Sequence, residues 1–151
     1  MLSRRQLIRN GVAASALSGL PVLKAFSAPL PRCIAIVDTQ LQGAGEFSAL
    51  YGPASSALHP FASDPGQLWM RVIEPALRRR PVSIAGFTSA PTLFCLQFLT
   101  RDYGLVLTGH VKGAGELAAA GNREDELLDL RDPYFRDRAA GFTWRLVPQR
   151  G

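Results

Sequence analysis

Apolar and polar positions follow one another along the chain in a repeating order of strand-like and helix-like segments. Residues 33–37 form a continuously apolar run that ends at Asp38, which is typical of a strand covered on both faces. Similar short runs predict three more strands, at 58–61, 82–87 and 105–107. Because Pro60 has no N–H to donate to a ladder, we expect the second of these strands at an edge of the sheet.

Segments with helical spacing separate the strands. They predict helices at 43–51, 63–77 and 88–103. Pro75 lies inside the second helix and should kink or locally open it. The third helix has Gly104 at its end as a left-handed cap, and its apolar residues, Phe98 and Leu99 among them, are expected in the core.

The pattern changes after Gly109. Residues 112–138 are polar and glycine-rich and predict an excursion of loops with at most a short helix. Residues 142–147 then alternate apolar and polar side chains, which predicts a half-exposed antiparallel strand at the sheet edge. Tyr134, Phe135 and Trp144 lie in or beside the excursion and would mark a contact surface if they are exposed together.

The order of these elements predicts an α/β fold. Alternating strands and helices favour right-handed crossovers and a mostly parallel sheet. We therefore expect a small three-layer domain of flavodoxin-like (Rossmann-like) kind, with four or five strands. The expected strand order is 2-1-3-4, with the antiparallel C-terminal strand at an edge.

The first 27 residues resemble a twin-arginine export signal. Arg4 and Arg5 are followed by the apolar run 11–23, and small residues at Ser27 and Ala28 fit cleavage by a leader peptidase. The resemblance implies export of the folded protein by the twin-arginine translocase into a bacterial periplasm. The run is too short to span a hydrocarbon core of about 30 Å. We therefore expect one domain over 28–151 and no stable membrane span after cleavage.

Removal of this leader changes the charge balance. The chain has 17 Lys and Arg residues against 12 Asp and Glu residues. Four of the basic residues lie in the leader, which has no acidic residue, so the mature chain carries 13 basic and 12 acidic residues, a net charge of +1. Nucleic-acid binding is not expected, because it requires a basic surface on the mature domain.

No motif in the chain assigns a reaction. The sequence from Gly43 to Gly45 begins a dinucleotide fingerprint, but Ser48 stands where the third glycine belongs. There is no Gly-x-Ser-x-Gly elbow, and neither the two histidines nor the two cysteines have metal-ligand spacing. We expect neither cofactor nor metal. Cys33 and Cys95 either form a disulfide in the periplasm or remain two small apolar thiols.

One group of polar residues is a candidate site. Ligands of open α/β sheets bind at the carboxyl ends of the strands, near the point where the strand order reverses. The residues expected there are Asp38, Thr39, Gln40, Thr88, Ser89 and His110. Each also has a structural explanation, since Asp38 can cap a loop and Thr88 and Ser89 can begin a helix.

Two functions are consistent with these features. The first is an exported periplasmic accessory or binding protein that assembles with a protein partner, such as a redox enzyme exported with it. The second is a protein that binds a small polar ligand, or an enzyme, using the crevice at the ends of strands 1, 3 and 4.

Overall fold

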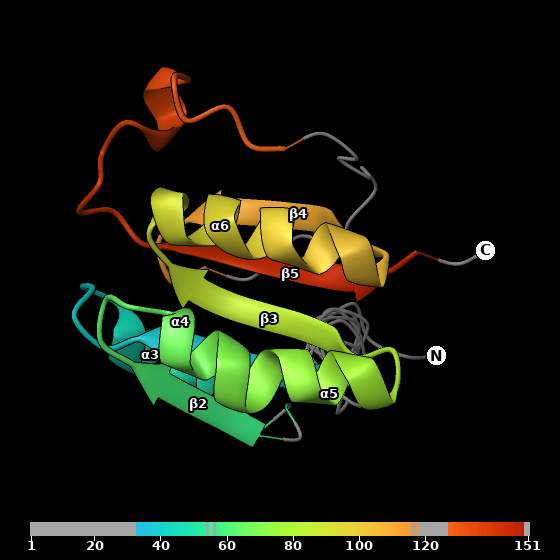
Figure 1. The fold of residues 1–151 in the computed structure, drawn as a ribbon. Helices are drawn as coiled ribbons and strands as arrows, with labels where there is room; N and C mark the ends of the chain where they lie inside the picture. The colour runs from blue at the N-terminus through green and yellow to red at the C-terminus, as the bar shows by residue number, and fades with distance from the viewer. Residues whose placement is uncertain (1–32, 54, 56, 116, 118–126, 150–151) are drawn as a thin grey trace, which may run out of the picture.

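A five-stranded mixed sheet organises the protein, for which the computed structural model describes residues 33–53, 55, 57–115, 117 and 127–149 (Figure 1). The strands are β1 (Cys33–Asp38), β2 (Ala57–Phe61), β3 (Ser83–Thr88), β4 (Leu105–Lys112) and β5 (Phe142–Pro148). Their order in space is β2-β1-β3-β5-β4. The predicted leader lies outside the described residues, together with Arg4, Arg5, Ser27 and Ala28.

β5 is antiparallel, as predicted, but its predicted place at the sheet edge is wrong. β5 pairs with β3 on one side and with β4 on the other, antiparallel to both. β1 is parallel to β2 and to β3. The sheet therefore has two parallel and two antiparallel pairings, and it differs from the mostly parallel, flavodoxin-like sheet that was expected. The α/β class itself is confirmed.

The burial of β5 gives the physical reason. Phe142 and Trp144 are fully buried on one face of the sheet, and Thr143 between them is fully buried on the other. The alternation of apolar and polar residues suggested a half-exposed strand, but the polar residue Thr143 satisfies its hydroxyl internally, because it donates to the Gly113 carbonyl at 2.8 Å. A strand buried on both faces belongs in the interior of a sheet.

Gly86 on β3 leaves room for the ring of Trp144 on β5. A Cβ atom at Gly86 would lie 2.1 Å from Cζ2 of Trp144, so the indole ring of β5 lies directly over the bare backbone of β3. The indole Nε1–H of Trp144 donates to Thr88 Oγ1 at 2.9 Å. β3 and β5 are thus joined by a ladder, a close ring contact and a buried hydrogen bond.

Helices cover both faces of the sheet. Helix α3 (Ala44–Tyr51) lies on one face, where Phe47 and Tyr51 pack on β1 and β3. The other face carries α4 (Gly66–Leu68), the π-helical turn η1 (Trp69–Ile73), α5 (Glu74–Arg79), α6 (Ala90–Thr100) and the 3₁₀ turn η2 (Arg101–Tyr103). Figure 1 shows α5 and α6 side by side on this face. Within the described ranges, no helix has the length and apolar character needed to cross a membrane.

Two predictions from proline are confirmed. β2 is an edge strand, and Pro60 lies within it. Just before Pro75 the helix opens into the π-helical turn, where the Glu74 N–H donates to the carbonyl of Trp69, five residues back. The pyrrolidine ring of Pro75 cannot donate a hydrogen bond and crowds the preceding turn, so the helix widens there rather than breaking.

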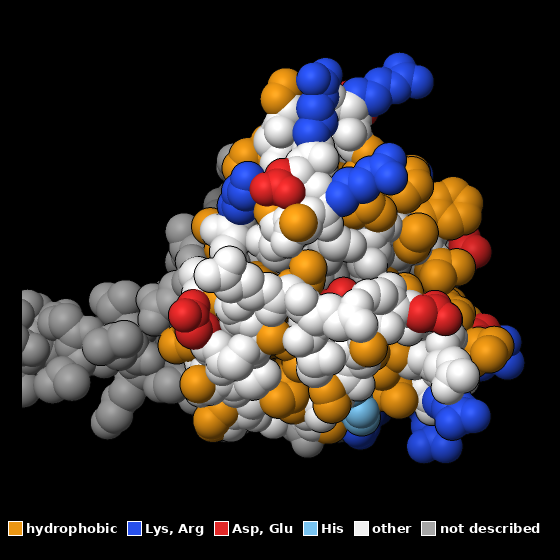
Figure 2. All heavy atoms as spheres, turned by 90° about the vertical axis from the view of Figure 1, so that its left-hand side faces the viewer, with side chains coloured by type: hydrophobic (Ala, Val, Ile, Leu, Met, Phe, Trp, Pro, Cys, Tyr) orange, Lys and Arg blue, Asp and Glu red, His pale blue; other side chains and the backbone are white. Residues whose placement is uncertain are grey.

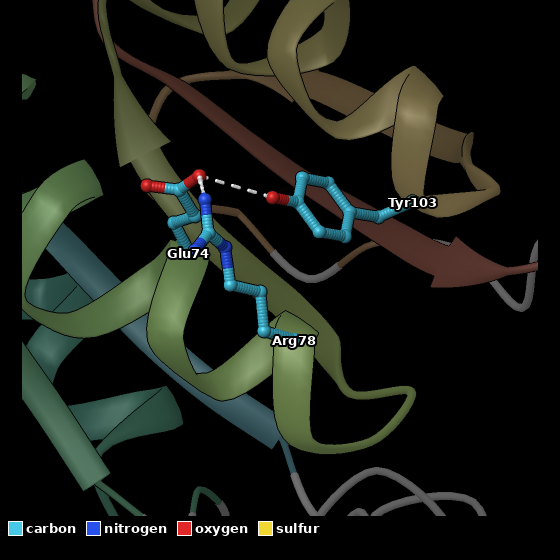
Figure 3. A network of polar contacts seen from close by, with 3 residues as sticks. All are labelled: Glu74, Arg78 and Tyr103. Carbon is cyan, nitrogen blue, oxygen red and sulfur yellow. Dashed lines mark hydrogen bonds and ion pairs between the residues drawn. The ribbon is translucent and has the colours of Figure 1, made fainter.

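A polar contact ties α5 to the end of α6 (Figure 3). The Tyr103 hydroxyl donates to Glu74 Oε1 at 3.1 Å, and Arg78 pairs with the same oxygen at 2.7 Å. The ring of Tyr103 also packs edge-on against Trp69, with 6.0 Å between ring centroids. These contacts join the two helical segments of this layer to each other.

The excursion at 112–138 is attached to the domain by buried groups. In its described part the only helical piece is the 3₁₀ turn η3 (Pro133–Phe135), which fits the prediction of loops with a short helix. The Leu128 N–H donates to Oε1 of the buried Gln97 on α6 at 3.0 Å. Phe135 is buried against His110 and Phe142. The described part of the return from β4 to β5 is therefore packed against the domain.

We predict that Gly86→Ala destabilises the protein by about 3 kcal/mol, because the new methyl group overlaps the rigid, buried ring of Trp144. Urea unfolding followed by fluorescence measures the change. Gly45→Ala is the matched control, since its Cβ would meet nothing within 4 Å and alanine favours a helix over glycine. Equal stabilities of the two variants would contradict the proposed role of Gly86.

Candidate functional site

The carboxyl ends of β1 and β2 bring three of the predicted residues together. Asp38 is buried, and its Oδ1 accepts hydrogen bonds from the N–H groups of Gln40 at 3.1 Å and Ser63 at 3.2 Å. The backbone N–H and the hydroxyl of Thr39 both donate to the carbonyl of Phe61, at 2.9 and 3.1 Å. The end of β1 is thereby fastened to the end of β2.

Ser63 completes this group, although the sequence reasoning did not select it. Its backbone has a φ of 60°, the left-handed region that favours glycine. Asp38 holds its N–H, and its hydroxyl donates to Gln40 Oε1. Backbone strain of this kind persists where the surroundings enforce it, often beside ligand sites. The turn-forming residues from Ser63 to Gly66 were the available signal in the sequence.

Thr88 and Ser89 lie at the end of β3 and interact with the protein itself. Thr88 is fully buried; its hydroxyl accepts from the Trp144 indole and donates to the carbonyl of Ser89 at 3.1 Å. Ser89 occupies the N-cap position of α6, but its hydroxyl donates to Thr92 Oγ1 at 3.1 Å instead of capping the backbone. The Thr88 hydroxyl is thus the hydrogen-bond acceptor of the buried Trp144 indole N–H.

His110 lies apart from the other predicted residues. The prediction placed β4 beside β3, but β5 lies between them, so His110 is two strand spacings, about 10 Å, from β3. A register shift between Leu107 and Gly109 puts His110 opposite Trp144. Its ring packs against Tyr134 and Phe135, with centroids 5.7 and 5.2 Å away. The imidazole belongs to an aromatic cluster beneath η3.

A pocket opens next to Ser63, between β2 and the π-helical turn. Its volume is about 490 Å³. The polar side chains that line it are His59, Asp64, Gln67 and Arg71. No sequence pattern linked these residues, because they come from a strand and a helix that only the fold brings together. The widened turn before Pro75 was the one predictable part of this pocket.

Cys33 and Cys95 are not joined by a disulfide, and they lie in very different surroundings. Cys33 is buried on β1, and Cys95 is exposed on α6. Burial raises the pKa of the Cys33 thiol, outweighing the opposing effect of the Arg145 guanidinium. This thiol therefore stays protonated at neutral pH and is a weak nucleophile. Across the described ranges no three His, Cys, Asp or Glu side chains are grouped to hold a metal ion.

Helix α6 exposes two large apolar side chains, contrary to expectation. Phe98 is 60% exposed and Leu99 38% exposed, whereas both were predicted to be in the core. Tyr134, Phe135 and Trp144, which would mark a contact surface if exposed together, are not exposed together, since Trp144 and Phe135 are buried and Tyr134 is exposed. Apolar residues occur on every side of this helix, so its periodicity did not distinguish the inner face from the outer.

We predict that Asp38→Ala lowers the free energy of unfolding by about 2 kcal/mol, because two backbone N–H groups lose a charged acceptor. Asp38→Asn keeps one carbonyl oxygen at this position and should cost less than about 1 kcal/mol. Chemical denaturation of both variants measures the difference. Equal losses would show that the hydrogen-bond acceptor is not what matters at this position.

No family model matches this chain, and no curated protein or solved structure matches it. The geometry of the described residues therefore carries the functional proposal.

Proposed function

We propose that the chain is an exported periplasmic accessory protein that binds another protein through the outer surface of α6. This surface is formed by Phe94, Cys95, Phe98 and Leu99, of which Phe94 is partly buried and the others exposed. The single observation that carries the proposal is the exposure of Phe98 and Leu99 on a surface helix.

The inner face of the same helix makes this exposure unusual. Gln97 is 3% exposed and Thr100 fully buried, although both are polar. Gln97 holds the Leu128 N–H, and the Thr100 hydroxyl donates to the Leu96 carbonyl at 2.8 Å. Polar residues thus face inward while the neighbouring Phe98 and Leu99 face outward. Adjacent large apolar side chains at the surface are typical of a protein contact.

The surrounding surface supports the same assignment. Figure 2 shows hydrophobic side chains along its right-hand edge, which is the front of the molecule in Figure 1, where α6 covers the sheet. Met70, on the π-helical turn of the same layer, is 64% exposed. Burying a large apolar side chain contributes roughly 1.5–3 kcal/mol. Two or three such residues suffice to anchor a contact of ordinary affinity.

The small-ligand crevice is the weaker of the two functions. Asp38 and Thr88 direct their polar atoms at groups of the protein itself. His110 is separated from them by β5. A protein partner, exported in the folded state with this chain, therefore agrees better with the positions of the exposed groups. A redox enzyme is one such partner, because twin-arginine substrates often carry cofactors inserted before export.

We predict that Phe98→Ser combined with Leu99→Ser abolishes recovery of the partner with the tagged full-length chain from the bacterium that makes it. The melting temperature should change by less than about 3 °C, because both side chains are exposed and surface substitutions have small effects. Affinity capture followed by mass spectrometry detects the partner.

Leu50→Ser is the matched control, since Leu50 is 47% exposed but lies on α3, across the sheet. It should retain the partner. Equal recovery with both variants would overturn the proposal, and a metabolite that raises the melting temperature of the wild type while no protein copurifies would favour the crevice.

We further propose that Arg4 and Arg5 direct export. Replacement of both by lysine should leave the uncleaved chain in the cytoplasm, because the translocase recognises the arginine pair. Arg9→Lys, outside the pair, is the control and should reach the periplasm. Fractionation and immunoblotting measure both, and normal periplasmic levels of the double-lysine variant would rule out this route.

A further inference from the structure

The pocket between β2 and the π-helical turn combines a cation, an anion and an apolar wall. Arg71 lies on the turn and Asp64 just before α4, and both line the pocket. Phe61, Leu68 and Val72 supply the apolar part of the lining. The pocket volume of about 490 Å³ lies within the range that accommodates small molecules.

Neither Arg71 nor Asp64 forms an ion pair with another described residue. The ion pairs among the described residues are Arg78 with Glu74 and Lys112 with Asp137, so Arg71 and Asp64 take part in neither. Oδ1 of Asp64 accepts the Gly66 N–H at 2.8 Å, which fixes the carboxylate and leaves Oδ2 available. Two opposite charges thus line one pocket without pairing with each other.

The strand side of the pocket is set by the sheet register. His59 pairs with Ile36, whose side chain belongs to the core beneath α5 and α6. His59 therefore points to the face of the sheet covered by α4, α5 and α6, as does Phe61 two residues later. On the other side, Leu68 and Val72 are four residues apart and share one face of the helical segment. These apolar groups line the pocket together with the two charged residues.

Two local distortions shape the pocket. The π-helical turn from Trp69 to Ile73 carries Arg71 and Val72, and such turns occur frequently at functional sites. Ser63, with its positive φ, precedes Asp64 and is held from the opposite side by Asp38 and Gln40. The π-helical turn and the hydrogen-bonded Ser63 thus set the backbone on the two sides of the pocket.

We infer that this pocket binds a small zwitterion with an apolar body, of the α-amino-acid class. The guanidinium of Arg71 would hold the carboxylate, for which its planar fork is suited. Asp64 would hold the ammonium group, and Phe61, Leu68 and Val72 would cover the apolar side chain. A simple anion would leave Asp64 unmatched, and a simple amine would leave Arg71 unmatched. The site is independent of the partner surface on α6.

Three probes of matched shape test the inference on the full-length chain. They are L-phenylalanine, 3-phenylpropanoate, which lacks the ammonium group, and 2-phenylethylamine, which lacks the carboxylate. Ligand-observed NMR and calorimetry should show L-phenylalanine binding at least about tenfold more tightly than either of the others, since each missing charge forfeits one charge-assisted contact.

Two charge-neutralising variants separate the contacts. Arg71→Gln should weaken L-phenylalanine and 3-phenylpropanoate about tenfold and leave 2-phenylethylamine unchanged, because only the first two carry a carboxylate. Asp64→Asn keeps an acceptor for Gly66 and should weaken only the two ligands with an ammonium group. Arg79→Gln, on α5 and outside the pocket lining, is the control and should change none of the three affinities.

Several results would overturn the inference. One is binding of 3-phenylpropanoate as tight as that of L-phenylalanine together with no effect of Asp64→Asn, which would make the site an anion site. Another is the absence of binding by all three probes at millimolar concentration while circular dichroism shows the native fold. Intact partner capture alongside that result would leave the function proposed for α6 standing.

Discussion

The contact between Trp144 and Gly86 is the constraint on which the rest of the structure depends. The indole lies over a backbone that has no Cβ, and its N–H is satisfied by the buried hydroxyl of Thr88. Burying an aromatic side chain of about 200 Å² at about 25 cal/mol per Å² contributes roughly 5 kcal/mol. Neither a larger residue than glycine on β3 nor a smaller ring on β5 would give the same fit. β5 is therefore fixed in the interior of the sheet.

The position of β5 determines how the polar residues are distributed. Because it separates β4 from β3, His110 joins the aromatic residues of η3 rather than Asp38 and Ser89. The chain must also travel from β4 around to β5, and it does so through a connection attached to Gln97. That attachment occupies the inner face of α6 with a polar residue. The outer face is left with Phe98 and Leu99, which is the surface proposed for a partner.

Local chemistry made some of these features predictable. Pro60 placed β2 at an edge, and Pro75 opened its helix, because a missing N–H acts within a few residues. The neighbours of β5 were not predictable, since Gly86 and Trp144 are 58 positions apart and no local rule pairs them. The orientation of α6 was not predictable either, because apolar residues on every side of a helix do not mark which face is the inner one. Asp38 was found by its position after a strand, whereas the pocket was missed because its residues become neighbours only in the fold.

The helical layer that carries α6 and the pocket differs from the layer that carries α3. Phe47 and Tyr51 of α3 stack on each other, and Phe47 also stacks on Phe87, so the aromatic side chains of α3 are committed to the core. On the opposite side, a polar contact near the surface links α5 to the end of α6 through Glu74, Arg78 and Tyr103. The outer residues of the two segments are therefore not needed to join them. The layer stabilised by this polar contact can therefore expose Phe98, Met70 and Arg71 without loss of packing. Residues that the core does not need are the ones available for recognition, and in the described part of the chain they are concentrated on this side of the sheet.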